Sequence, residues 1–384
     1  MKRVVIRPWF IIPPRVTPNI WTNIHEILDP EYVQKETEQR LQKCLRKDFA
    51  LVVSALDAME NIKEYFIEWN EENDYHPELY KACFTPISQK WIGQLTKLTI
   101  KVPPQLLKSL AAVRLRNLET LEYHFCTGQM LPQDIDDIHN GFLVFVNNLK
   151  DSLEYISFIS THTSLNLDIT RIYKLLGTFP KLRSISLSAP FDGAHLSDPL
   201  AFVRFLEKHR STLKDISVLT SRCTVHSRPS DPESINWIQK ILTSVDIPFP
   251  RLRSIALAMR PLRASLTNVS DFLEKHMSTL DSLILADRAL DYCGFERLLK
   301  TASGPLDLEG LRHLRVKLTN FTPSILYYLA YKIPGLTSLD IECSSITNCR
   351  SDGGFASYLS FISVFIFLTC AFLIGSILQC NHCQ

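Results

Sequence analysis

A short apolar pattern, Leu-x-x-Leu-x-Leu, recurs along this chain and is clearest in two segments with nearly identical sequences. Residues 179–191 read FPKLRSISLSAPF and residues 249–261 read FPRLRSIALAMRP. The last three positions of the pattern alternate, as in a strand with one buried face. We therefore expect the first, fourth and sixth positions of each copy to point inward and the positions between them to point outward.

The pattern occurs at eleven places, which are nine clear copies and two weaker ones near the N-terminus. From Ile62 onward, successive copies begin about thirty residues apart, a common length for a structural repeat. A unit of this length has room for one strand, one helix and two loops. The clear copies begin at Leu95, Leu118, Leu153, Leu182, Leu213, Leu252, Leu280, Leu311 and Leu336, and the weaker ones begin at Met1 and Ile62.

The segments between these strands have helical patterns. Residues 198–213 and 268–280 share the sequence FLEKHxSTL, and further helices are expected at 232–245, 294–303 and 323–333. Their apolar residues recur at i, i+3 and i+4, and each segment begins near Ser, Asn, Asp, Gly or Pro. A strand-plus-helix unit cannot bury its own apolar face, so stacked units must share one core. The expected fold is an α/β repeat solenoid with a curved parallel sheet inside and helices outside, and chance repetition in a leucine-rich chain is the alternative.

At these residues the chain resembles leucine-rich repeat proteins of the ribonuclease-inhibitor-like, curved α/β type. The wording of PxLRSIxL and STLxxLxL is similar to the leucine-rich repeat half of fungal F-box proteins. This resemblance implies a surface that recognises the substrates of a ubiquitin ligase. The Asn or Cys that follows the strand in the usual repeat is mostly absent here, so we expect irregular repeats.

The F-box motif itself is not found near the N-terminus. Binding to a ubiquitin ligase adaptor is therefore expected only if an F-box precedes Met1. Two interpretations of the N-terminus stay open, because an uncapped solenoid end exposes apolar core and an unpaired strand edge. Either upstream sequence is missing from this chain, or the long helical stretch at 31–58 folds over the first repeats as a cap.

The last apolar stretch changes the expected organisation. Residues 355–378, FASYLSFISVFIFLTCAFLIGSIL, are 24 uncharged residues, long enough to span a bilayer. They predict a C-terminal transmembrane helix, with the repeats in the cytosol because Arg350 flanks the segment on that side. A hydrophobic read-through without cellular meaning is the alternative, and the protein would then be cytoplasmic. The predicted divisions are first irregular repeats with a long helix at 1–89, the solenoid at 90–346, a linker at 347–354, the transmembrane helix at 355–378 and a tail at 379–384.

Composition and motifs limit the kinds of partner and activity that the sequence supports. The 42 basic and 40 acidic residues leave a formal net charge of +2, which gives no electrostatic reason to expect a nucleic acid partner. Ten scattered cysteines suggest buried thiols in a reducing compartment. The sequence has no GxxxxGK[ST], GxGxxG, HExxH or GxSxG motif, so we expect no enzyme, no cofactor and no metal, and a triad dispersed in sequence is the remaining catalytic alternative. His209 and His276 recur in the FLEKH copies and predict a structural, partly charged imidazole at a helix end.

The outward strand positions are the candidate partner-binding surface. They are charged near both ends of the array and small in the middle, so a partner's backbone could come close at the centre while charges fix its orientation. The alternative is that these charges only solvate the sheet and pair across strands. We expect non-enzymatic protein–protein recognition by this concave face, and the alternative function is a tail-anchored membrane adaptor or scaffold that presents the repeats to cytosolic partners. The candidate residues are Lys97, Lys101, Glu122, His124, Ser184, Ser186, Ser254, His313, Arg315, Lys317, Asp340 and Glu342.

Overall fold

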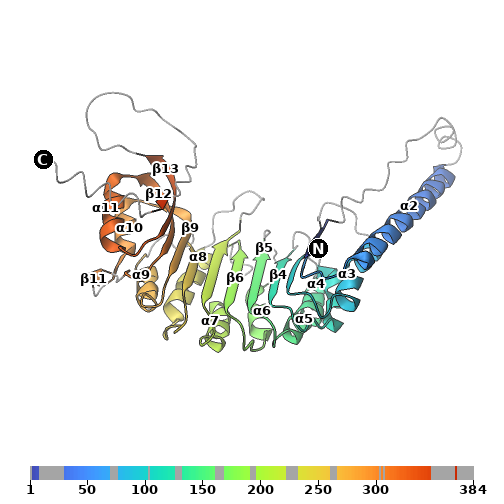
Figure 1. Ribbon diagram of the computed structural model, residues 1–384, viewed down its shortest axis with the longest axis horizontal. Coiled ribbons are helices and arrows are strands. Elements are labelled where there is room, and N and C mark those ends of the chain that lie inside the picture. Colours follow the sequence, from blue (N-terminus) through green and yellow to red (C-terminus); the bar gives the residue numbers. More distant parts are fainter. Residues whose placement is uncertain are drawn as a thin grey trace, which may run out of the picture. The chain divides into compact units, whose positions relative to one another are not determined.

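Eleven parallel strands that alternate with helices dominate the computed structural model (Figure 1). They belong to two compact units, with four of these strands in unit 1 and seven in unit 2. Each of the eleven sequence patterns forms one of these strands, which confirms the predicted strands and fits a repeat solenoid. The structure describes residues 2–7, 30–69, 77–102, 104–125, 132–160, 168–190, 196–221, 232–259, 266–301, 304–305, 308–346 and 368–369.

Unit 1 comprises residues 1–128 and 132–153, and its parallel sheet has the order β1-β2-β3-β4. The sixth positions of the pattern are in register, because Ile67 pairs with Ile100 and Ile100 pairs with Tyr123. Its elements are β1 (Arg3–Ile6), α2 (Pro30–Ala58), β2 (Glu64–Glu68), α3 (Pro77–Gln89), β3 (Lys97–Val102), the 3-10 helix η2 (Pro104–Ala112), β4 (Thr120–Phe125), α4 (Pro132–Asp137), the π-helix η3 (Ile138–Phe142) and α5 (Leu143–Asn148).

Unit 2 comprises residues 129–131 and 154–384, and its parallel strands follow the order β5-β6-β7-β8-β9-β12-β13. The two-residue strands β10 and β11 pair only with each other. The elements are β5 (Tyr155–Ser160), α6 (Ile169–Leu175), β6 (Ser184–Ala189), α7 (Pro199–Lys208), β7 (Asp215–Thr220), α8 (Pro232–Ser244), β8 (Ser254–Ala258), α9 (Thr267–Glu274), β9 (Ser282–Leu290), α10 (Tyr292–Leu298), β10 (Lys300–Thr301), β11 (Gly304–Pro305), β12 (His313–Phe321), α11 (Pro323–Lys332), β13 (Ser338–Ile346) and β14 (Leu368–Thr369).

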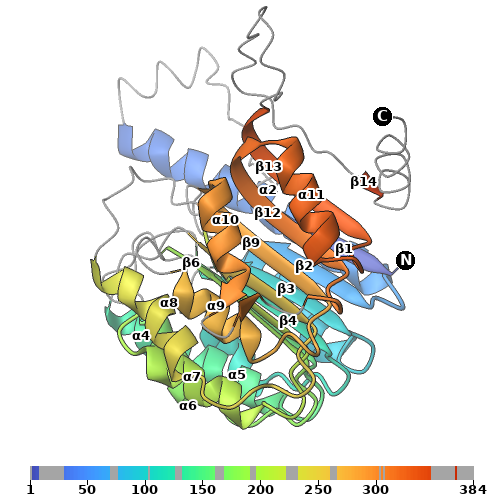
Figure 2. The same cartoon turned by 90° about the vertical axis from the view of Figure 1, so that its left-hand side faces the viewer.

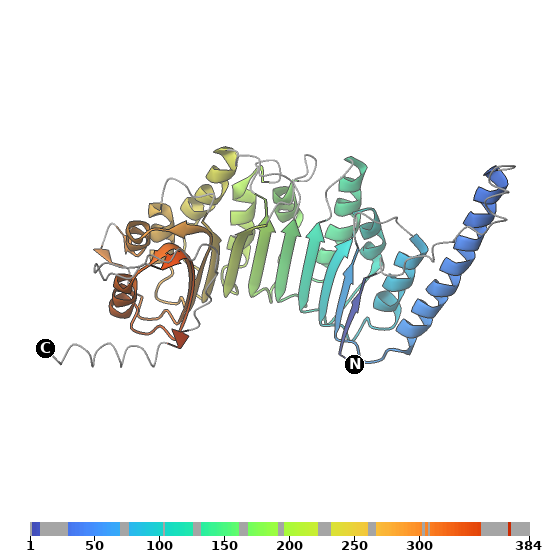
Figure 3. The ribbon, with the colours of Figure 1, turned by 90° about the horizontal axis from the view of Figure 1, so that it is seen from above.

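The core lies between each sheet and the helices that cover one of its faces. From the copy that begins at Ile62 onward, the first, fourth and sixth positions are buried as predicted, whereas Ile6 in the first copy is half-exposed. Leu182, just before β6, and Ile185 and Leu187 within it are fully inaccessible to solvent. The helices of each unit lie on one side of its sheet (Figure 3), and α7 packs against both α6 and α8 (Figure 2). Several helices begin at proline, which suits the first helical turn because that turn has no partner for its N–H groups.

A repeated backbone contact sets the level at which the strands begin. Within each unit, the carbonyl of the residue before a strand accepts hydrogen bonds from two consecutive N–H groups of the next repeat, those of the first strand residue and of the residue before it. The Arg183 carbonyl accepts from Lys214 N at 2.7 Å and from Asp215 N at 3.0 Å. The Lys63 carbonyl of unit 1 accepts in the same way from two N–H groups before and at the start of β3, at 2.8 and 3.0 Å. This contact satisfies both lone pairs of the carbonyl and holds neighbouring strands in one register.

The other ends of the strands are less regular. Between β9 and β12 the pairing shifts from Leu285 with Val316 to Leu290 with Leu318, so β9 has extra residues there. Asp287, inside this bulge, has a positive φ of 72°, a conformation that non-glycine residues rarely adopt. The strand therefore departs from the repeat only after its regular start.

The two duplicated motifs contact each other, which explains why they occur together. Lys208 of the first FLEKH copy donates from Nζ to the Leu176 carbonyl, 3.3 Å away at the end of α6. His209 donates from Nδ1 to the Phe205 carbonyl at 2.7 Å, and its Nε2 accepts from Phe179 N at 2.9 Å. Phe179 begins the FPKLRSI copy, so the helix end of one repeat is joined to the strand approach of the repeat before it.

The second pair of copies repeats this arrangement. Lys275 donates to the Val245 carbonyl at 2.8 Å, and His276 donates from Nδ1 to the Phe272 carbonyl at 2.8 Å. The His276 ring stacks on Phe249 with centroids 5.6 Å apart, although its buried Nε2 has no hydrogen-bond partner among the residues that the structure describes. Burial lowers the pKa of both motif histidines, so the prediction of a partly charged imidazole is wrong: each ring is a neutral part of the core.

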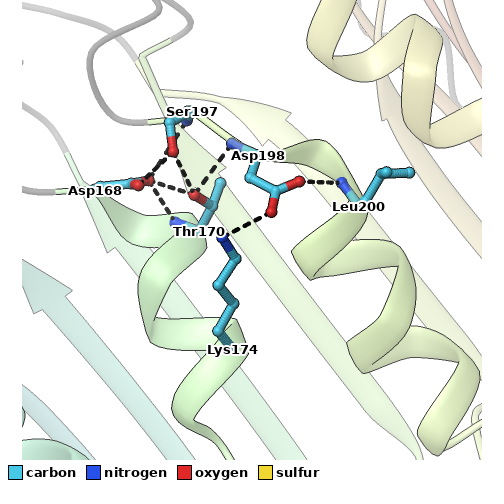
Figure 4. A network of polar contacts seen from close by, with 6 residues as sticks. All are labelled: Asp168, Thr170, Lys174, Ser197, Asp198 and Leu200. Carbon is cyan, nitrogen blue, oxygen red and sulfur yellow. Dashed lines mark hydrogen bonds and ion pairs between the residues drawn. The ribbon is translucent and has the colours of Figure 1, made fainter.

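A polar network joins the starts of α6 and α7 (Figure 4). The Asp168 carboxylate caps α6 by accepting from Thr170 N at 3.0 Å, and it also accepts from Ser197 Oγ at 2.5 Å. Asp198 caps α7 and forms an ion pair with Lys174 of α6 at 2.8 Å. One helix start is thereby bonded to the next along the repeat array.

The predicted transmembrane helix requires correction. Among the residues that the structure describes, no helix combines the length and the apolar character needed to cross a bilayer. Within 355–378 only Leu368–Thr369 are described, and they form β14, which pairs antiparallel with the start of β13. An extended segment bonded to a sheet edge is not part of a continuous helix, and apolar length alone did not reveal this backbone conformation. The membrane location inferred from that helix is withdrawn. The predicted linker at 347–354 and the predicted tail at 379–384 lie outside the described residues.

Candidate partner-binding surface

The twelve candidate residues all occupy outward strand positions, on the side of each sheet that we call the open face because helices cover the opposite side (Figure 3). None of them is fully buried. Those in unit 1 are Lys97 and Lys101 on β3 and Glu122 and His124 on β4. Those in unit 2 are Ser184 and Ser186 on β6, Ser254 on β8, His313, Arg315 and Lys317 on β12, and Asp340 and Glu342 on β13.

Charges on the open face of unit 1 pair with one another. The Glu68 carboxylate lies 3.0 Å from Lys101 Nζ and 3.0 Å from Arg7 Nε. Burial alone would raise the pKa of Glu68, but the hydrogen bonds from these two cations outweigh burial and lower it. His124 Nε2 lies 2.7 Å from Glu122 Oε1, and this hydrogen bond lowers the pKa of Glu122. The surface is therefore locally neutralised.

The charged end of unit 2 is paired in the same manner. Arg315 Nε lies 3.2 Å from Asp340 Oδ2, and Lys317 forms an ion pair with Glu342. These residues are direct register partners on β12 and β13. Exposed pairs of this kind contribute about 0–1 kcal/mol to stability. The pairing across strands that the sequence left as an alternative is present at these four residues, while His313 stands exposed at the start of β12.

The centre of the unit 2 open face carries small side chains. Ser186 pairs in register with Ser217 of β7, and Ser217 pairs with Ala256 of β8. The two serines are half-buried, and Ala256 is buried. A partner that binds here can bring its own backbone close to the sheet, since Ser186, Ser217 and Ala256 all have short side chains.

Asp215 is a surface residue that the sequence analysis missed. It lies between Ser184 and Ser254 in one register row of the open face. Its carboxylate makes no hydrogen bond or ion pair in the part of the chain that the structure describes. Burial raises its pKa, although the charges of Lys214 and Arg253 act in the opposite direction. The signal was present in the sequence, because Asp215 is the third position of the copy that begins at Leu213.

The described residues show no grouped chemistry for metal binding or thiol catalysis. Over these ranges, no set of three or more His, Cys, Asp and Glu side chains is placed to hold a metal ion. Cys83 is a buried free thiol whose pKa is raised to about 12 by burial, so it stays protonated and unreactive. Cys343 is also buried, and Cys293 is exposed.

Comparison with known proteins adds no relative. No protein-family model matches the chain, and no curated protein matches it either. The case for a function therefore rests on the repeat pattern, the register of the strands and the character of the open face.

Proposed function

We propose that this chain is a non-enzymatic protein-recognition module that binds its partner on the open face of its sheet. The observation that carries the proposal is the row of half-buried serines and buried alanine at the centre of unit 2. The small side chains form a floor, and the ion pairs on β12 and β13 lie to one side of it, beyond β9. Such a surface offers backbone proximity and orientation and no reactive group.

The wording of the repeats supports a more specific form of this proposal. The chain resembles the leucine-rich repeat half of fungal F-box proteins, in which the repeats select substrates for a ubiquitin ligase. We propose the same kind of role here, namely holding a protein substrate on the open face. Contact with a ligase adaptor would additionally require an F-box.

The test blocks the serine floor and leaves the fold intact. We expect the double variant Ser186→Trp/Ser217→Trp to lose the proteins that the unmodified full chain captures after crosslinking, because two indoles cover the floor of small side chains and keep a partner's backbone away from the sheet. The matched control is Leu175→Trp/Leu200→Trp, at two exposed positions on the helix side. Both variants should melt within a few degrees of the unmodified chain.

The comparison of the two variants decides the outcome. Loss of the same proteins from the floor variant alone would support the proposal. Equal capture by both variants, measured by quantitative mass spectrometry, would place the binding site elsewhere on the molecule and contradict it.

A further inference from the structure

Five exposed or half-exposed cations gather where β6, β7 and β8 begin, and we call them the basic row. They are Lys181, Arg183, Lys214, Arg251 and Arg253. Backbone contacts place their strands side by side, because Lys214 N donates to the Arg183 carbonyl and Arg253 N donates to the Lys214 carbonyl, both at 2.7 Å. The row lies at the edge of the open face of unit 2, next to the serine floor.

Most of these cations make no hydrogen bond or ion pair within the described chain, although the charges of Lys214 and Arg253 act on the nearby Asp215 carboxylate. Arg183 forms an ion pair with Glu154 at 3.0 Å. The other four side chains make no hydrogen bond or ion pair over the described ranges. This sets them apart from the open-face cations of β12, which are paired with acids on β13. The basic row therefore has unused capacity to bind negative charge.

Packing does not account for these cations. In the duplicated motif the apolar residues are buried, and Phe179, Leu182 and Ile185 are fully inaccessible to solvent. The two basic positions of the motif, occupied by Lys181 and Arg183 in one copy and by Arg251 and Arg253 in the other, are exposed in both. The apolar residues of the motif are needed for packing, whereas its basic residues are exposed and can bind a ligand.

The extent of the row limits what it can bind. Glu154 and Asp281 stand before the strands on either side, β5 and β9, and Asp215 lies within the row. Three adjacent strands span about 10 Å, since neighbouring strands lie about 4.8 Å apart. A nucleic acid backbone favours a longer continuous positive surface. The Cβ atoms of residues at i and i+4 of a helix lie about 5–6 Å apart, so glutamates at these positions can reach cations on neighbouring strands.

We propose that the basic row binds an acidic segment of a partner protein, with carboxylates of one helix face on Lys214, Arg253 and their neighbours. This inference rests on the proposed recognition function and adds the chemistry of the partner. The carboxylate of Asp215 opposes the ligand, so it limits affinity and disfavours acidic segments that approach out of register.

The test uses a defined probe, a fluorescein-labelled alanine-based peptide with glutamates at i, i+4 and i+8, and the same peptide with glutamines. Fluorescence anisotropy with the full chain should show binding of the glutamate peptide only, weakening with added salt as screening increases. Lys214→Glu/Arg253→Glu should reduce affinity by about tenfold or more. The neutral pair Lys214→Gln/Arg253→Gln should show a smaller loss and guards against misfolding of the reversal variant. Asp215→Asn should tighten binding by about twofold to threefold.

A control with the same change in charge identifies the site. Arg204→Glu/Lys240→Glu lies on exposed positions of α7 and α8, on the helix side, and should leave affinity within about twofold. An equal loss in this control, or weaker binding by Asp215→Asn, would overturn the inference. Tighter binding of a single-stranded DNA oligonucleotide than of the glutamate peptide would also overturn it. If the peptide fails to bind but the serine-floor variant still loses its captured proteins, the acidic partner is wrong and the recognition function stands.

Discussion

His209 and His276 are single residues on which two repeats depend. Each ring is buried, each donates from Nδ1 to the carbonyl four residues earlier, and each contacts the phenylalanine that begins the preceding motif. The contacts require a neutral ring, because Nε2 of His209 accepts a hydrogen bond from Phe179 N. Protonation would place a charge in the core without a counterion.

These histidines predict a pH-dependent stability. Burial lowers their pKa in the folded state, while the unfolded chain has a value of about 6.5. Below a pH of about 6.5 the unfolded state binds more protons than the folded state, so the free energy of unfolding falls as the pH drops. The two histidines contribute their full stabilisation only above that pH. The slope is at most about 1.4 kcal/mol per pH unit for each histidine.

Urea denaturation between pH 8 and pH 5 measures this slope. The variant His209→Gln/His276→Gln should be less stable at pH 8 and should depend less on pH. An unchanged slope in the double variant would show that these rings do not control the acid response.

For single residues, the sequence predicts which face of the sheet a side chain occupies but not which side chain it pairs with. The pattern beginning at Leu213 places Asp215 on the open face, so its position could be predicted. The pairing of Arg315 with Asp340 could not be, because it depends on which residues of β12 and β13 fall in register. Reversing Arg315 and Lys317 would place like charges beside Asp340 and Glu342, so it would test these pairs as much as partner binding.

Among the elements, η3 is a π-helix between α4 and α5 that lies against η2. Gly141 makes this contact possible. A Cβ at Gly141 would lie 2.4 Å from the Leu107 carbonyl oxygen and 2.5 Å from the Lys108 Cα. Backbone atoms cannot move aside as a flexible side chain can, so only glycine fits at this crossing.

We therefore expect Gly141→Ala to destabilise unit 1 by roughly 1–3 kcal/mol or more, the range seen for overpacked sites. Gly93→Ala is the matched control, since a Cβ there would meet no atom within 4 Å. Thermal melting followed by circular dichroism measures both variants. Equal melting temperatures for the two would contradict the close approach of η3 and η2.

The strands were the most predictable elements because a buried face leaves a strict alternation in the sequence. The extra residues of β9 after Leu285 could not be predicted in this way, because a bulge does not require a particular order of apolar and polar residues. The apolar stretch 355–378 misled for a related reason. Hydropathy reports the need for burial, but not whether the backbone is helical or extended.

At the scale of the molecule, each repeat contacts mainly the repeats beside it. In unit 2 the contacts run from β5 to β6, β6 to β7 and onward, and the helices follow the same sequence. Such an array has stability that varies along its length, because each repeat depends on its own packing and its two interfaces.

Leu187→Ala tests this local dependence. Leu187 is fully buried on β6, and truncation should cost about 2–5 kcal/mol. Hydrogen exchange followed by mass spectrometry should show the largest loss of protection in β5, β6, β7 and their helices, and a smaller loss in β12 and β13. A uniform loss across unit 2 would indicate a single cooperative globule.

The carbonyl that accepts two hydrogen bonds at the start of a strand affects where the sequence can tolerate insertions and deletions. It anchors the beginning of a strand to its predecessor, and it places no restriction on the residues that follow the strand. Accordingly, β6 ends at Ala189 and α7 begins at Pro199, whereas β12 ends at Phe321 and α11 begins already at Pro323. Insertions and deletions can accumulate along one border of the sheet without disturbing the spacing at the other, which leaves the arrangement of Arg183, Lys214 and Arg253 intact while the opposite loops diverge.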